Sequence, residues 1–129
     1  MLASMSKQSV EFKSATPNPD NNGVLDITAE ELETIIEANK TLPVMIDVRE
    51  PDEYTGELGH IDGARLVPLA SLPQKVGTFS KDQTIVFVCR SGGRSARATA
   101  LALETGLSAV YNLKGGMLRW NQLGFDIKK

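Results

Sequence analysis

One stretch of the chain constrains its fold more than any other. It is an apolar run, then a glycine-rich loop that opens with the only cysteine, then a helix-forming run. Residues 84–88 are rich in β-branched side chains and predict a buried strand. Residues 96–104 favour a helix, because most of them are strong helix formers. Cys89 is therefore expected at a strand-to-helix turn, which is typical of α/β proteins.

The loop at this turn has the composition of an anion-binding site. It consists of Cys89, Arg90, Ser91, Gly92, Gly93, Arg94 and Ser95. The two glycines allow the backbone to curl so that several N–H groups face inward, and Ser95 is expected to cap the helix. These amides, the helix N-terminus and the two arginines predict a pocket for an anion. The same groups would favour the nucleophilic thiolate form of Cys89, so we expect Cys89 to be catalytic and residues 90–95 to bind substrate.

A different interpretation of Cys89 has to be weighed. A lone cysteine after an apolar strand is more often a small buried hydrophobic residue. The residues around it argue against that interpretation, because burying Arg90 and Arg94 beside an inert thiol would be costly.

Composition and charge exclude several classes of function. The 129 residues are enough for one domain with its own core, and no apolar run approaches the roughly 20 residues of a membrane span. The net charge of −2 gives no global basic field for nucleic acid, so we expect neither a nucleic-acid nor a membrane partner. One cysteine and one histidine make neither a disulfide nor a metal site, and we expect no metal and no cofactor.

The pattern along the chain predicts an α/β fold. Strands are expected at 24–27, 44–48, 65–68, 84–88 and 109–113, and helices from 28 to about 39, at 71–76, 96–104 and 117–123. Thr28 with Glu31 indicates a capping box, whereas Pro73 is expected to break the weak helix 71–76. This alternation predicts a mainly parallel sheet of about five strands with helices on both faces.

The first residues look different from the rest. Residues 1–23 are rich in serine, proline and asparagine and show no hydrophobic period, so we expect a flexible N-terminal tail or linker before a domain at 24–129. This stretch lacks the apolar core of a signal peptide, and we therefore expect a cytoplasmic protein.

Charged side chains gather where the strand at 44–48 ends. Asp47, Arg49 and Glu53 lie there, and the carboxyl ends of parallel strands share one edge of a sheet. We expect these residues near Cys89, where they either brace the loop through salt bridges or contact the substrate. His60 is expected to be structural, and Trp120 is expected to pack in the core.

Four blocks of the sequence together resemble a known family. They are residues 47–54, residues 59–64, residues 89–95, and Gly115–Gly116 followed by Trp120. In this order and spacing the blocks resemble a single-domain rhodanese over residues 24–127. The resemblance implies the rhodanese-like α/β fold and a sulfurtransferase whose Cys89 carries sulfur as a persulfide. It also implies a small anionic donor such as thiosulfate, and a thiol or cyanide as acceptor, a protein thiol included, with no cofactor or metal.

Two alternatives to this function stay open. Protein tyrosine phosphatases and related arsenate reductases also use a cysteine on such a turn, but their pattern needs an arginine six positions after it, where this chain has Ser95. The six-residue loop from Cys89 to Arg94 suits a single sulfur atom better than a tetrahedral phosphate. Arsenate reduction often needs a second cysteine as well. The other alternative is a sulfur-carrier module whose Cys89 is loaded by a partner protein.

Overall fold

The computed structural model describes residues 10–129, and its centre is a six-stranded sheet. The strands are β1 (Thr16–Pro17), β2 (Leu25–Ile27), β3 (Val44–Asp47), β4 (Arg65–Leu66), β5 (Ile85–Val88) and β6 (Val110–Leu113). They lie in the order β1-β2-β6-β5-β3-β4, and every neighbouring pair is parallel except β1 with β2. The predicted parallel sheet is confirmed, with one short antiparallel strand added at its edge.

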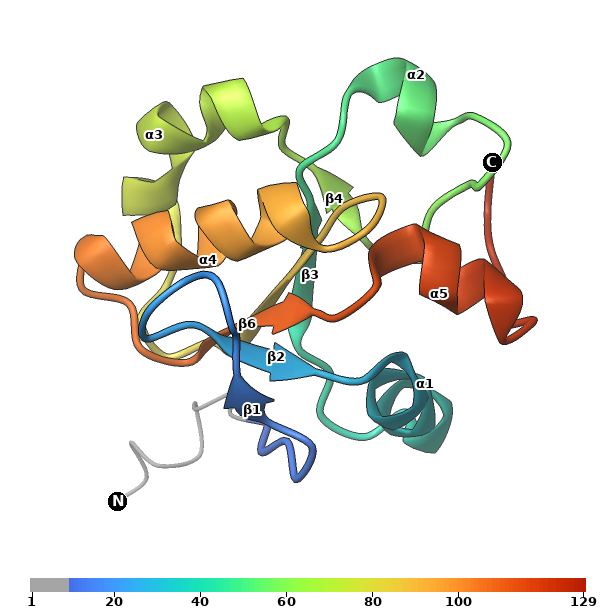
Figure 1. Ribbon diagram of the computed structural model, residues 1–129, viewed down its shortest axis with the longest axis horizontal. Coiled ribbons are helices and arrows are strands. Elements are labelled where there is room, and N and C mark those ends of the chain that lie inside the picture. The colour runs from blue at the N-terminus through green and yellow to red at the C-terminus, as the bar shows by residue number, and fades with distance from the viewer. Residues whose placement is uncertain (1–9) are drawn as a thin grey trace.

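Helices cover both faces of the sheet. They are α1 (Ala29–Ala38), α2 (Pro51–Tyr54), α3 (Leu72–Lys75), α4 (Gly93–Glu104) and α5 (Gly116–Gln122), and 3₁₀ turns at Leu69–Ser71 and Val76–Thr78 flank α3. In Figure 1, α1 and α5 lie on one side of the sheet, and α3 and α4 lie on the other. Within residues 10–129, no helix has the length and apolar character needed to span a membrane.

The side chains of β5 divide the core in two. Val86 and Val88 pack in the cluster that contains α1 and α5 residues, whereas Ile85 and Phe87 pack with residues of α3 and α4. This alternation is the two-residue period of a strand. Cys89 continues it and faces the α4 side. The register of β5 with β3 pairs Val88 with Asp47, so both strands end at the same edge of the sheet.

The structure differs from the expected tail over residues 10–23, while residues 1–9 lie outside the described residues. Phe12 is buried, and its ring centroid is 4.9 Å from that of Tyr111. Thr16 pairs with Asp26 in the antiparallel register of β1 with β2. The contacts of this segment come from single residues and a two-residue strand, so they leave no hydrophobic period in the sequence.

Two local predictions need correction. The Thr28 hydroxyl accepts the Glu31 N–H at 3.1 Å as predicted, but the Glu31 carboxylate accepts from the amides of Lys13 and Ser14 instead of closing the capping box. The N-terminal segment supplies donors that a local motif does not foresee. Pro73 does not break α3, because it lies in the first turn, where a helix does not use that N–H group.

Candidate active site

Cys89 follows β5 directly, and α4 begins four residues later, earlier than predicted. The N-cap of α4 is Gly92, whose φ of 109° lies in the left-handed region that glycine adopts readily. Ser95 therefore lies inside the first turn and does not cap the helix. Its hydroxyl is 3.2 Å from Cys89 Sγ and 2.5 Å from Asn112 Oδ1. The glycine turns the chain into the helix early enough to place Ser95 beside the sulfur.

The sulfur is buried but polar in its surroundings. Only 1% of Cys89 is exposed, while Ser91, Gly92 and Gly93 of the loop line a depression of about 250 Å³. Sγ accepts the Gly92 N–H at 3.0 Å. No acceptor among residues 10–129 takes the amide hydrogens of Ser91, Gly93 or Arg94, which leaves donors at the start of α4 available to an anion.

The start of α5 is hydrogen-bonded to the backbone of the cysteine loop. The Met117 N–H donates to the Cys89 carbonyl and the Leu118 N–H to the Arg90 carbonyl, each at 2.9 Å. Gly116 has a φ of 55°, and a Cβ there would lie 2.6 Å from the Arg90 carbonyl oxygen and against the Cys89 carbonyl as well. Only glycine lets the two backbones approach this closely.

The two arginines of the loop have different surroundings. Arg90 is exposed, and no carboxylate among residues 10–129 forms an ion pair with it. Arg94 donates to both oxygens of Glu53 at 2.8 Å. These hydrogen bonds lower the pKa of Glu53 to about 2. The Arg94 guanidinium is therefore already occupied by a carboxylate.

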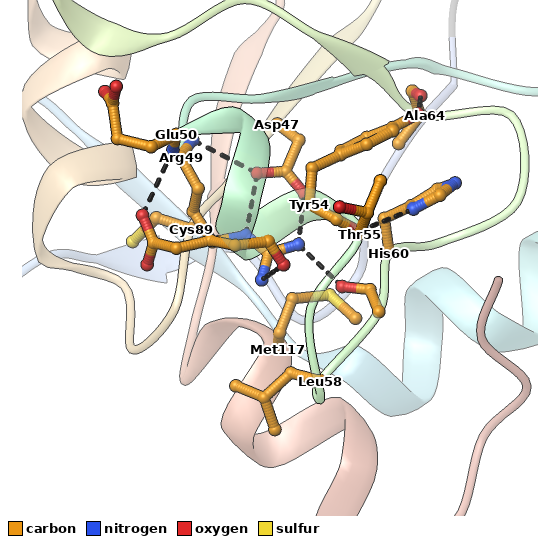
Figure 2. Close-up of polar contacts among 12 residues, drawn as sticks. Asp47, Arg49, Glu50, Tyr54, Thr55, Leu58, His60, Ala64, Cys89 and Met117 are labelled. Carbon is orange, nitrogen blue, oxygen red and sulfur yellow. Dashed lines mark hydrogen bonds and ion pairs between the residues drawn. The ribbon is translucent and has the colours of Figure 1, made fainter. Parts of the chain in front are cut away.

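Asp47 and Arg49 form a buried pair beside this arrangement. The Asp47 carboxylate accepts from Arg49 Nε at 2.9 Å and Nη2 at 2.8 Å, and the two residues are at most 1% exposed. Figure 2 shows Arg49 beside Asp47. Arg49 also donates to the carbonyls of Gly59 at 2.7 Å and Glu53 at 3.2 Å. The pair thereby fixes α2, and α2 carries the Glu53 that binds Arg94. Asp47, Arg49 and Glu53 thus lie close together, and Glu53 contacts the loop through Arg94.

A shallow depression adjoins the loop. It has a volume of about 170 Å³, and the charged side chains that line it are those of Arg49, Asp52, Glu53, Glu57 and Arg90. Three carboxylates and two guanidinium groups thus line this depression. The site is therefore less electropositive than the sequence of the loop alone suggests.

His60 and Trp120 make structural contacts. The His60 ring stacks on Tyr54 at 3.6 Å between centroids, and its Nδ1 is 2.8 Å from the Tyr54 carbonyl oxygen. The Tyr54 hydroxyl donates to Ala64, and burial raises the pKa of Tyr54. Trp120 is 2% exposed and donates to the Asp126 carbonyl at 2.9 Å.

Sequence reasoning missed two polar residues behind the loop. Asp26 on β2 and Asn112 on β6 are both buried, and Asn112 joins Asp26 to Ser95 through hydrogen bonds. Each is a lone polar residue within an otherwise apolar strand. That interruption is the signal that could have identified them, because a buried polar side chain requires partners.

A cysteine that follows a buried parallel strand and accepts an amide hydrogen at the start of a helix places the chain among α/β domains with a cysteine loop at a strand-to-helix turn. The chain belongs to the family described as the rhodanese-like domain, which matches residues 28–123. This finding confirms the resemblance seen in the sequence.

Relatives from bacteria support the assignment. The chain is 42% identical over 76 residues to YqhL of Bacillus subtilis, covering 59% of this chain and 59% of YqhL. It is 39% identical to YtwF of the same organism, covering 75% of this chain and 90% of YtwF. It is 34% identical to the thiosulfate sulfurtransferase GlpE of Pseudomonas paraeruginosa, covering 61% of this chain and 70% of GlpE. The match to YqhL thus spans less than two thirds of that relative's length.

Solved structures share the fold. A rhodanese-like domain protein from Staphylococcus aureus has a TM-score of 0.68 and 31% identity, covering 81% of this chain and 98% of that chain. A Rhodopseudomonas palustris protein of unknown function, described as a possible tyrosine phosphatase, has a TM-score of 0.70 and 26% identity, covering 78% and 82%. Fold similarity alone therefore does not separate sulfur transfer from phosphatase chemistry.

Proposed function

We propose that this protein is a sulfurtransferase in which Cys89 accepts a sulfur atom as a persulfide and passes it to a thiol or to cyanide. The observation that carries the proposal is the hydrogen bond from the Gly92 N–H to Cys89 Sγ, next to unused amides at the start of α4. Such donors stabilise negative charge on sulfur. The name of GlpE, thiosulfate sulfurtransferase, agrees with this chemistry.

The proposed reaction has two displacement steps. The Cys89 thiolate attacks the outer sulfur of thiosulfate, the S–S bond of the donor breaks, and sulfite leaves with the electron pair. The acceptor, a thiolate or cyanide, then attacks the outer sulfur of the persulfide, and Cys89 leaves as the thiolate. Electrons balance in each step, and no metal or cofactor is part of the scheme.

The residues of the loop divide the work of binding the donor. The exposed guanidinium of Arg90 binds the incoming anion first, and the amides of residues 91–95 stabilise the charged sulfur. Arg94 joins them when its ion pair with Glu53 opens. Because the sulfur is 1% exposed, the wall of the loop must move as the donor enters. We place this reaction in the cytoplasm, as expected from the sequence.

The alternatives predict different products. Thiosulfate and cyanide mixed with the protein should give thiocyanate at a rate that disappears in Cys89→Ser. Arg90→Ala should raise KM for thiosulfate, whereas Arg97→Ala, an exposed arginine on α4, is the matched control and should not. Hydrolysis of an aryl phosphate without thiocyanate would instead support a phosphatase. Stoichiometric persulfide without turnover would support a sulfur carrier loaded by a partner.

A further inference from the structure

The buried polar residues behind the cysteine loop form one chain of hydrogen bonds. Asp26, Asn112 and Ser95 are at most 5% exposed. Asp26 Oδ1 accepts from Asn112 Nδ2 at 2.9 Å and from Asn18 Nδ2 at 3.0 Å. Asn112 Oδ1 accepts the Ser95 hydroxyl at 2.5 Å, and Ser95 Oγ is 3.2 Å from Cys89 Sγ. The chain therefore connects the N-terminal segment and two strands to the sulfur.

The direction of these hydrogen bonds follows from Asp26. Asp26 Oδ1 accepts from the amide nitrogen of Asn112, so the amide oxygen of Asn112 faces Ser95. A serine hydroxyl has a single proton to donate. Two acceptors lie within reach of that proton, Asn112 Oδ1 and Cys89 Sγ, and only one of them can receive it at a time.

We propose that Asn112, oriented by Asp26, is a positioning residue that competes with Cys89 for the Ser95 proton. This inference rests on the proposed function of Cys89. In the thiol state, the Cys89 S–H donates to Ser95 Oγ while Ser95 donates to Asn112, and all three groups are satisfied. When the thiol loses its proton to solvent, the Ser95 O–H turns to the sulfur, and Asn112 Oδ1 loses its donor. No proton leaves Ser95 in either state.

The persulfide restores the hydrogen bond from Ser95 to Asn112. Its negative charge lies on the outer sulfur, so Sγ becomes a weak acceptor again and the Ser95 hydroxyl returns to Asn112. A buried acceptor without a donor is unfavourable, so Asn112 disfavours the free thiolate relative to both the thiol and the loaded persulfide. The competition therefore lowers the reactivity of Cys89 when it carries no extra sulfur, and it lengthens the lifetime of the persulfide.

A double-mutant cycle with Ser95 tests this competition without any sulfur chemistry. The readout is the rate at which iodoacetamide alkylates Cys89 at pH 7. Asn112→Leu should raise the rate several-fold, since the Ser95 hydroxyl then serves only the sulfur. Ser95→Ala should lower the rate, and Asn112→Leu should have no effect in the Ser95→Ala background. The proposal would be overturned if Asn112→Leu lowered the alkylation rate. It would also be overturned if Asn112→Leu changed that rate equally in the wild-type and Ser95→Ala backgrounds.

Two further measurements separate positioning from a loss of structure. Asn112→Leu removes one of the hydrogen-bond donors of the Asp26 carboxylate. The double variant D26L/N112L removes both polar groups, so the same cycle with Ser95→Ala can be repeated without a buried carboxylate that lacks a donor. After loading with thiosulfate and removal of the excess, N112L should hold its persulfide for a several-fold shorter time. Faster alkylation with shorter persulfide lifetime supports the proposal, whereas a decrease in both contradicts it. A wild-type protein that forms no persulfide would refute the proposed function, while the alkylation cycle would still decide the competition.

Discussion

Two carboxylate–guanidinium pairs stand near the cysteine loop, and they differ in burial. Asp47 and Arg49 are 0% and 1% exposed, and Arg49 has two further carbonyl partners. The side chains of Glu53 and Arg94 are 28% and 31% exposed, and they bind each other. The first pair is a fixed part of the fold. The second is partly open to water, and we propose that a substrate anion replaces Glu53 on Arg94.

The largest effect should come from breaking the buried pair. Arg49→Ala leaves the Asp47 carboxylate buried without its partner and should lower the free energy of unfolding by about 3–5 kcal/mol. Urea denaturation measures this change. Arg119→Ala is the matched control, because it breaks an ion pair with Glu30 that is about half exposed, and it should change the free energy of unfolding far less than Arg49→Ala does. Equal effects of the two variants would remove the distinction between buried and exposed pairs.

The contact between α5 and the cysteine loop should be the next most sensitive. Gly116→Ala places a Cβ 2.6 Å from the Arg90 carbonyl oxygen and should cost about 2–4 kcal/mol together with most of the sulfur-transfer rate.

Gly124→Ala separates this clash from backbone strain. Gly124 also has a positive φ, of 75°, but nothing lies within 4 Å of its added Cβ. It should cost about 1 kcal/mol and leave activity intact. A Gly116 variant that matched the Gly124 variant in both respects would show that α5 does not hold the loop.

Weakening the exposed pair should change substrate binding more than stability. Glu53→Gln lowers the competition for Arg94, so KM for thiosulfate should fall a few-fold with little change in kcat, at a stability cost of at most about 1 kcal/mol. Asp52→Asn is the control, since it removes a neighbouring charge of α2 that does not bind Arg94. Arg94→Ala should raise KM. An unchanged KM in the Glu53 and Arg94 variants would mean that Arg94 only braces the loop.

The smallest effect concerns pH. The pKa of Glu53 in the folded protein is about 2, below its ordinary value of 4.5, because Arg94 stabilises the carboxylate. The stability that this pair adds is therefore complete above pH 4.5 and is lost as the pH falls towards 2. The difference in unfolding free energy between wild type and Glu53→Gln should stay constant from pH 7 to pH 5 and shrink by pH 3. A difference that changed between pH 7 and pH 5 would contradict the assignment.

Local patterns predicted the parts of the site that lie close together in the sequence. The strand before Cys89 and the glycines after it are encoded within a few residues, so the β-branched apolar run and the glycine pair were enough to predict the strand and the turn. The Glu53–Arg94 pair joins residues 41 positions apart, and it forms only once β3 and β5 are neighbours. Ser95 was wrongly predicted as the N-cap for a different, local reason. Two consecutive glycines leave the start of the helix ambiguous.

The N-terminal segment shows a second limit of sequence reasoning. Residues 10–23 contain no repeated apolar pattern, yet Phe12 joins the core and Asn18 reaches Asp26 at 3.0 Å. Single contacts of this kind depend on the surface that the rest of the chain presents. They can be read from an assembled sheet but not from the order of the residues alone.

The proposed function depends most on the ability of Cys89 to carry a second sulfur atom. The direct measurement is the intact mass of the protein after incubation with thiosulfate and removal of the excess, with Cys89→Ser treated in parallel. We expect the wild type to gain the mass of one sulfur atom, to lose it on addition of cyanide, and the variant to gain none. An unchanged mass of the wild-type protein, or equal gains of mass in the wild type and in Cys89→Ser, would contradict the proposed role of Cys89.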